Sequence, residues 1–459
     1  MVLPGGSAAS GFVGVLCLWM SAQAAAALQA CLETGRAPGC TAPVRLAETL
    51  QEASRPVTAA SRCEWTLPSG EPGLVSVLLP VYNRAERVAD ALDSVWNQTY
   101  RPIELIVVDD GSADGTADAV WAWGASVVGN GQGAEGGRRS TENGWEVGDG
   151  QFRLRYVYQE NAGAPAARNR GVRESHGELI QFLDSDDELH PERFEKLVPI
   201  VQSEGCDTVH SGFERRCGNC GTFLGRYIPP QTDNALETCL QGNLWINTFD
   251  FLDRRSLIAR VGPWDESLIC AQDLDYSYRR LLNASSVGIL QESLYTYDTF
   301  GADRISTKRQ SPEGWQSRLH AEARLSQELM SGNHGVSTGA RNAYATDLYA
   351  VGVKLHAAGL ASIGQQYAEV AGRLEAPPVP LALKRMRALC NAGPFVCRPW
   401  VAARELERKL KQAIGKEGKP HRCSVGDQRP EVRGRNRERK AQMTERRTSN
   451  EEPETTNQE

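Results

Sequence analysis

The sequence predicts an α/β fold in which helices flank a mostly parallel sheet. Three features of the chain indicate that class. Apolar runs without charge recur as candidate strands, helical stretches with apolar residues three or four positions apart follow them, and polar or acidic clusters stand where strands end. Charge-free strands are typical of a parallel sheet covered on both faces, and alternation of strand and helix is the pattern of βαβ units.

The strands and helices are expected to alternate along the chain. The first strand is predicted over Leu74 to Val81, and Val88, Leu92 and Val95 mark the apolar face of the helix that follows. Later strands are predicted over 105–108, 156–159 and 179–183, and later helices over 114–123, 164–174 and 192–201. Such a series implies right-handed crossovers in an open sheet. The glycine-rich polar segment 129–150 interrupts it and is predicted to be a flexible insertion.

Length and composition exclude several classes of protein. A chain of 459 residues allows two or three domains, and 41% hydrophobic with 24% charged residues excludes a polytopic membrane protein or a fully disordered chain. The net charge of −6 argues against a protein that coats nucleic acid, so no nucleic-acid partner is expected. The 12 cysteines are sparse for a disulfide scaffold, which favours reduced thiols.

The two ends of the chain differ from the middle. Within an N-terminal region over 1–72, residues 11–30 carry no charge and are interpreted as a signal peptide, a membrane anchor or a soluble helix. Residues 311–415 are predicted to form a helical extension, and the charged segment 416–459 a disordered tail. We expect a cytoplasmic protein, with membrane association or entry into the secretory pathway through 11–30 as the alternatives.

Three polar clusters follow predicted strands, where the loops of a parallel sheet form a crevice. They are Pro80-Val81-Tyr82-Asn83, Asp109-Asp110-Gly111-Ser112 and Asp184-Ser185-Asp186-Asp187. Carboxylates of this kind suit Mg²⁺ or Mn²⁺ shared with a diphosphate, whereas the glycine motif of dinucleotide-binding folds and the P-loop are both missing from the sequence. The structural alternative is that Asp187 caps a helix beginning near Pro191.

Several motifs in order resemble a known family. The runs VSVLLPVYNRAERVADALDSVWNQTY, IELIVVDDGSADGT, NAGAPAARNRGV and GELIQFLDSDDELHPERFEKLV, within Val75 to Asp298, resemble the catalytic core of inverting family 2 glycosyltransferases. The resemblance implies a Rossmann-like GT-A domain over 73–300. It also implies transfer of a sugar from a nucleotide-diphosphate donor, expected to be a UDP-sugar, to a hydroxyl of a saccharide, lipid or protein.

The resemblance also implies roles for individual residues. The expected nucleotide-binding residues are Pro80, Val81, Tyr82, Asn83, Asp109, Asp110, Arg168 and Asp184. Among them, Asp110, together with Asp109, is expected to bond the base, and Arg168 to lie near the phosphates. Asp184 and Asp186 form the Asp-x-Asp motif that is expected to hold Mn²⁺ or Mg²⁺.

A second part of the resemblance is the run GPWDESL followed by AQDLD. Family members commonly carry Glu-Asp at this helix start, and the Asp acts as general base; here the pair is Gln272-Asp273. Asp273 is therefore the predicted base, and Asp275 is the competing candidate, since residues two apart on a helix point about 200° from each other. The Gln272 departure supports an alternative, a non-catalytic nucleotide-sugar-binding protein on the same fold.

Two other groups of residues have open interpretations. Cys206, His210, Cys217 and Cys220 are either a zinc site or reduced thiols around a hairpin over 208–227. The basic run 433–440 either contacts nucleic acid or anionic lipid or belongs to a solvated tail, and the acidic residues around it favour the tail.

Overall fold

The structure, a computed structural model, describes residues 65–127, 139–141, 143–148, 150–203, 205–218, 220–299, 310–331 and 334–413. The hypotheses about the segment 11–30, the basic run 433–440 and the charged tail 416–459 lie outside these residues. In the described part of the chain, no helix is long and apolar enough to cross a membrane.

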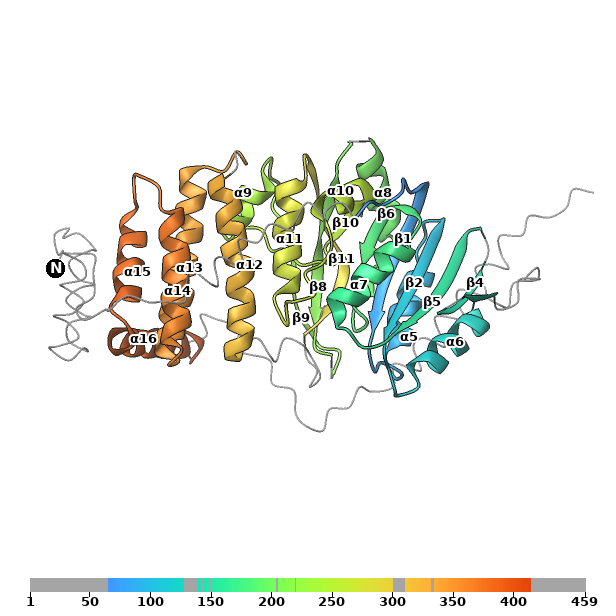
Figure 1. Ribbon diagram of the computed structural model, residues 1–459, viewed down its shortest axis with the longest axis horizontal. Coiled ribbons are helices and arrows are strands. Elements are labelled where there is room, and N and C mark those ends of the chain that lie inside the picture. The colour runs from blue at the N-terminus through green and yellow to red at the C-terminus, as the bar shows by residue number, and fades with distance from the viewer. Residues whose placement is uncertain are drawn as a thin grey trace, which may run out of the picture.

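One mixed sheet of eleven strands organises the described residues (Figure 1). Its strands are β1 (Glu71–Val81), β2 (Ile103–Asp110), β3 (Arg139–Thr141), β4 (Gly144–Gly148), β5 (Phe152–Gln159), β6 (Gly177–Phe182), β7 (Glu188–Leu189), β8 (Thr208–Arg216), β9 (Phe223–Tyr227), β10 (Phe251–Arg254) and β11 (Val287–Asp298). They lie in the order β3-β4-β5-β2-β1-β6-β10-β8-β11-β7, and β9 pairs with β8. The strands β5, β2, β1 and β6 are parallel neighbours, so the predicted parallel core is confirmed. The antiparallel strand β10 joins β6 to β8.

Helices cover both faces of the sheet, which explains why residues 74–81 of the central strand β1 carry no charge. The helices of this region are α5 (Val88–Trp96), α6 (Thr116–Val127), α7 (Ala164–Glu174), α8 (Arg193–Ser203), α9 (Ala235–Leu240), α10 (Arg255–Val261) and α11 (Gln272–Asn283). In β1, Val77 and Leu79 join the core cluster beneath α5, α6 and α8, while Leu78 joins the opposite cluster with α7, α10 and α11. Alternate side chains of a strand point to opposite faces, so both faces of β1 are apolar.

The predicted insertion over 129–150 differs from expectation in its second half. β3 and β4 form an antiparallel hairpin, and β4 pairs with β5 at the edge of the sheet. Trp145 of this hairpin is buried and stacks on Tyr156 at a ring distance of 5.4 Å. The glycines and polar residues of the segment hid this strand from a composition-based prediction, because its two buried side chains, Trp145 and Val147, carry the whole apolar signal.

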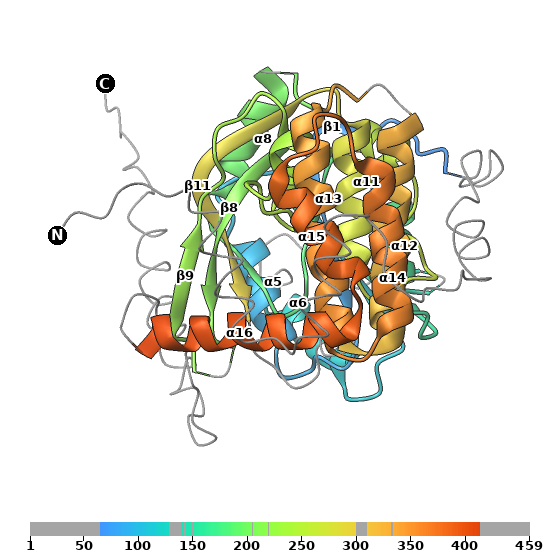
Figure 2. The same cartoon turned by 90° about the vertical axis from the view of Figure 1, so that its left-hand side faces the viewer.

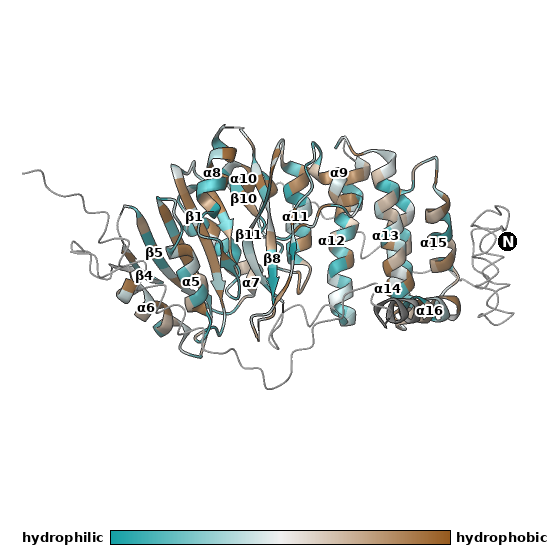
Figure 3. Ribbon diagram, turned by 180° about the vertical axis from the view of Figure 1, so that it is seen from behind, coloured by the Kyte–Doolittle hydropathy of each residue, from teal (hydrophilic) through white to brown (hydrophobic). Residues whose placement is uncertain are grey.

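The helical extension is confirmed and packs directly on the sheet region. It consists of α12 (Pro312–Ser331), α13 (Thr338–Ala357), α14 (Ala361–Leu374), α15 (Leu381–Asn391) and α16 (Pro394–Ala413). The first four run alongside one another, and α16 crosses their ends (Figure 2). Figure 3 shows hydrophilic and hydrophobic residues interspersed along α12 and α13. One apolar cluster contains Leu236 of α9, Leu281 of α11 and Leu348 of α13, so the extension shares a core with the sheet region.

A buried ion pair fixes α11 to the middle of the sheet. The Arg280 guanidinium of α11 donates to Asp253 of β10 at 2.9 and 3.1 Å, and both side chains are fully buried. Burial raises the pKa of Asp253, although the charge of Arg280 opposes that rise. Thr208 donates a further bond of 2.7 Å to the same carboxylate, so this buried charge is well paired.

We expect Asp253→Ala to lower the free energy of unfolding by about 3 to 5 kcal/mol, because it leaves the buried Arg280 charge uncompensated. Arg226→Gln removes an exposed ion pair with Glu214 and is the matched control, expected to cost under about 1 kcal/mol. Urea unfolding monitored by circular dichroism measures both. Equal losses in the two variants would contradict the assignment of α11 to this buried anchor.

Candidate active site

The loops that follow β1 and β2 are bonded to each other at the carboxyl edge of the sheet. The Asn83 N–H donates to Ser112 Oγ at 2.9 Å, and the Ala113 N–H donates to Asn83 Oδ1 at 3.0 Å. Asn83 adopts a φ of 51°, a left-handed conformation that asparagine tolerates better than most residues. Of the predicted nucleotide-binding residues here, Tyr82 is 49% exposed while Val81 is buried. The two loops therefore form one surface on which the Tyr82 ring is open to solvent.

The paired aspartates at the end of β2 are both buried and serve different loops. Asp109 accepts from the Tyr156 hydroxyl at 2.7 Å and from the Ser112 N–H at 2.8 Å. The pKa of Tyr156 is raised by its burial and by this bond. Asp110 instead organises the loop after β5.

Asp110 accepts from Gln159 Nε2 at 2.7 Å and from the backbone N–H groups of Ala162 and Gly163 at 2.9 and 2.8 Å. It thereby fixes the entrance to α7, whose buried Arg168 is the next predicted site residue. Its predicted bond to a base would add to these contacts, since each carboxylate oxygen has two lone pairs.

The Asp-x-Asp motif lies in the turn after β6. Asp184 and Asp186 are half-buried, and the Arg168 guanidinium donates to Asp184 Oδ1 at 2.7 Å. Asp187 is buried and accepts from the Tyr295 hydroxyl at 2.8 Å and the Asp298 N–H at 2.9 Å. The predicted helix cap by Asp187 is therefore wrong, because its carboxylate is bonded to β11.

The three carboxylates form a centre of concentrated negative charge. Burial, followed by the charges of Asp186 and Asp184, raises the pKa of Asp187 well above its usual range. A cation beside Asp184 and Asp186 would offset that repulsion, so this pair fits a divalent ion. Among the described residues, no group of three or more acidic, histidine or cysteine side chains could hold a metal. Two carboxylates alone leave the coordination shell incomplete, as expected for an ion completed by ligand phosphates.

The zinc hypothesis is not supported. His210 contacts the Trp245 carbonyl at 3.0 Å and lies 3.7 Å from Asp250. Cys206 and Cys217 are buried and form no disulfide among the described residues, and Cys220 contacts Thr222 Oγ1 at 3.1 Å. The structure favours the alternative, in which β8 and β9 form a hairpin with reduced thiols.

A buried tryptophan joins the acidic turn to α11. The Arg168 guanidinium lies over the Trp264 ring, 4.6 Å from its centroid, and Trp264 stacks on Tyr276 of α11 at 4.0 Å. Asn169 donates to the Trp264 carbonyl at 3.0 Å and accepts from the Trp264 N–H at 2.8 Å. The sequence contained Trp264 within a recognised motif, but nothing local indicated that it supports Arg168.

The two candidate bases on α11 have different environments. Asp275 is 2% exposed in its side chain, and its Oδ2 accepts from Arg279 at 2.7 Å while its Oδ1 accepts from Arg324 at 2.8 Å. Asp273 is half-buried in the first turn of the helix. A general base must be able to reach a substrate proton. The burial of Asp275 and its two arginine bonds therefore favour Asp273 as the base.

Gln272 has a structural role that the expected glutamate could not fill in its ionised form. Its Nε2 donates to the Leu268 carbonyl at 2.8 Å and closes the turn that leads into α11. An ionised carboxylate only accepts hydrogen bonds and would meet that carbonyl with like charge. Glutamine at position 272, in place of the expected glutamate, therefore stabilises the start of α11 and leaves Asp273 in place.

The arrangement as a whole defines a protein of the GT-A fold class. Acidic residues stand at the carboxyl edge of a mostly parallel sheet. The antiparallel strand β10 links this sheet to α11, whose first turn carries a carboxylate. Residues 76–257 match the family model of glycosyl transferase family 2.

The chain resembles curated relatives over about 60% of their length, and one solved structure in its fold. The chain is 28% identical over 240 residues to the uncharacterized glycosyltransferase EpsJ of Bacillus subtilis, covering 49% of this chain and 60% of that protein. It is 29% identical over 207 residues to glycosyltransferase AglE of Haloferax volcanii, covering 45% and 60%. The crystal structure of S. aureus TarS in complex with UDP-GlcNAc aligns with a TM-score of 0.53 at 16% identity, covering 73% of this chain and 92% of that one. The last likeness shows the fold alone.

We expect Asp275→Asn to lower the free energy of unfolding by about 3 kcal/mol or more, since it removes the anion from a buried cluster with two arginines. Asp273→Asn removes a half-buried carboxylate two positions away and is expected to cost under about 1 kcal/mol. Denaturant unfolding compares the two. A larger loss for Asp273→Asn would contradict the environments described for them.

Proposed function

We propose that the protein is a metal-dependent, inverting glycosyltransferase that moves a sugar from a UDP-sugar to an acceptor hydroxyl. The observation that carries the proposal is the juxtaposition of Arg168, Asp184 and Asp186 at the carboxyl edge of β6. It offers positive charge and two hard oxygen ligands side by side, as a nucleoside diphosphate requires. UDP as the nucleotide is supported by the TarS structures, which hold UDP and UDP-GlcNAc.

Different loops at the carboxyl edge of the sheet bind different parts of the donor. The joined loops after β1 and β2 receive the nucleoside, with the exposed Tyr82 ring against the base and Asp110 supplying an acceptor for a base N–H. Arg168, held by Trp264 and Asp184, faces the diphosphate. Asp184 and Asp186 would hold the divalent cation, which supplies positive charge that stabilises the departing diphosphate.

Asp273 then takes the proton of the acceptor hydroxyl while that oxygen attacks the sugar C1. The attack comes from the face opposite the leaving diphosphate, so a single displacement inverts the anomeric carbon. The bond from the acceptor oxygen to C1 forms as the bond from C1 to the diphosphate oxygen breaks, and the proton stays on Asp273. The alternative, a non-catalytic sugar-nucleotide-binding protein, loses its main support because Gln272 has a structural reason of its own.

We expect Asp273→Asn to lower kcat by roughly 10² to 10⁴ with little change in UDP affinity, because a general base acts on the acceptor and not on the nucleotide. The measurement is release of UDP from a panel of UDP-sugars, with GDP- and dTDP-sugars as donor controls, in the presence of Mn²⁺. Asp118→Asn, on the exposed side of α6, is the charge-matched control and should retain wild-type kcat. A kcat within a few-fold of wild type in Asp273→Asn would refute the assignment of the base.

We expect Mn²⁺ to strengthen UDP binding by roughly tenfold or more, about 1.4 kcal/mol, because the diphosphate completes the coordination shell. Asp186→Ala should remove that gain, while Asp118→Ala should keep it. Calorimetric titration of UDP with and without Mn²⁺ measures both. Equal UDP affinity in the two conditions for the wild-type protein would rule out the metal assignment.

A further inference from the structure

The loop over 262–271, which leads into α11, is held by the first helix of the C-terminal extension. Ser317 of α12 donates to the Cys270 carbonyl at 2.7 Å and accepts from the Cys270 N–H at 3.3 Å. The Cys270 thiol donates to the Gly314 carbonyl at 3.1 Å. All three bonds lie three residues before Asp273, so α12 fixes the backbone immediately upstream of the proposed base.

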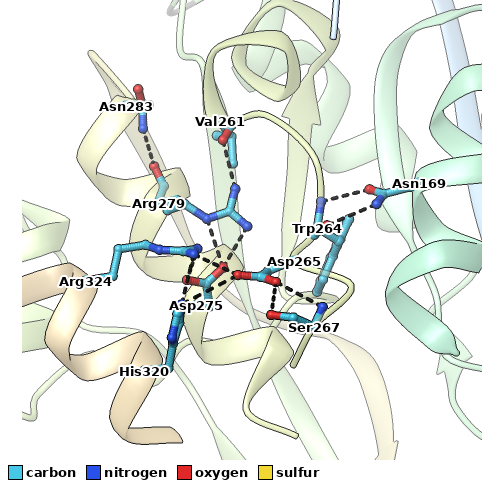
Figure 4. Close-up of polar contacts among 10 residues, drawn as sticks. All are labelled: Asn169, Val261, Trp264, Asp265, Ser267, Asp275, Arg279, Asn283, His320 and Arg324. Atoms are coloured by element: carbon cyan, nitrogen blue, oxygen red, sulfur yellow. Dashed lines mark hydrogen bonds and ion pairs between the residues drawn. The ribbon is translucent and has the colours of Figure 1, made fainter. Parts of the chain in front are cut away.

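Seven residues further along α12, Arg324 bridges both sides of the same loop (Figure 4). Its Nη2 donates to Asp265 Oδ2 at 2.7 Å, and its Nη1 donates to Asp275 Oδ1 at 2.8 Å. The Arg324 side chain is only 16% exposed and Asp275 only 2%. A planar guanidinium can bond two carboxylates at once in a fixed relative position, which an ammonium group cannot.

The two aspartates connect Arg324 to both halves of the proposed site. Asp273 and Asp275 both lie in the first turn of α11, about 200° apart around the helix axis. A bond that fixes Asp275 therefore also fixes the turn from which Asp273 projects. Asp265 follows Trp264 directly, and Trp264 supports Arg168 over the acidic turn. Asp265 Oδ1 also accepts from the Ser267 N–H at 3.0 Å, which holds this end of the loop in a tight turn.

The backbone between the two holding points is strained. Ala271 adopts a φ of 58°, a left-handed conformation that is unfavourable for a residue with a side chain. Such a conformation persists only where the surroundings hold it. Here the Ser317 bonds hold the residue before Ala271, and Arg324 holds the helical turn after it.

We propose that Arg324 is a positioning residue for the transfer reaction, which sets the orientation of Asp273 by tying Asp265 and Asp275 together from α12. The inference rests on the proposed function, since it gives Asp273 the role of base. It gives α12, the first helix of the C-terminal extension, a role in positioning the proposed base.

The test is Arg324→Met in the full chain, with Arg324→Lys as the conservative variant. We expect kcat of Arg324→Met to fall by about 10²-fold, as a displaced catalytic group costs, while the Kd for UDP with Mn²⁺ changes by less than about twofold. Arg324→Lys keeps one of the two ion pairs and should give an intermediate kcat. The matched control is Arg318→Met, since Arg318 lies on the same helix but pairs with Glu322 at 3.2 Å.

Hydrogen exchange of the backbone amides supplies a readout that is independent of activity. We expect faster exchange across residues 265–275 in Arg324→Met and wild-type exchange there in Arg318→Met. If Arg324→Met retains kcat within threefold, or if Arg318→Met loses as much kcat, the positioning role is wrong. If the wild-type chain turns over no sugar nucleotide, the proposed function fails, and unchanged exchange at 265–275 would separately overturn the role of Arg324 in holding the loop.

Discussion

The buried ring of Trp264 is the contact on which the site depends. It stacks on Tyr276 of α11, packs edge-on against Phe182 of β6 and carries the Arg168 guanidinium on its face. Its backbone is bonded on both sides by Asn169 of α7. One side chain therefore lies between the strand β6 that leads into the acidic turn, the helix α7 that carries Arg168 and the helix α11 whose first turn carries Asp273. Aromatic stacking in a closed core tolerates little displacement, so these three elements move together.

Two carboxylates near this ring, Asp275 and Asp265, are paired with arginines. Asp275 has two, and burial is outweighed at Asp265, where the Ser267 bonds and the Arg324 charge lower the pKa of the carboxyl. The acidic turn after β6 is different. Arg168 pairs with Asp184 there, while the buried Asp187 accepts hydrogen bonds from the Tyr295 hydroxyl and the Asp298 N–H. Under the proposed function, a cation held by Asp184 and Asp186 would offset the negative charge of this turn.

The parallel core could be predicted from the sequence because its signals are local. Charge-free strands and helical spacing identified β1, α5 and α7, and the motif at 184–187 located the acidic turn. The strand β4 was missed because only two of its residues, Trp145 and Val147, are buried. Arg324 was missed for a different reason, since it lies among apolar residues on α12 and its partners Asp265 and Asp275 are 59 and 49 positions away. Contacts at that separation leave no periodic trace in a single sequence.

The shared core of α9, α11 and α13 has a consequence for how the chain is made. Synthesis proceeds from the N-terminus, so every described strand of the sheet is made before α12 and α13. Until then Leu236 and Leu281 lack the apolar side chains that later cover them, and Asp275 lacks one of its two arginines. A nascent chain that ends before α12 therefore exposes apolar side chains that the finished protein buries, and its loop over 262–271 lacks the contacts from Ser317 and Arg324.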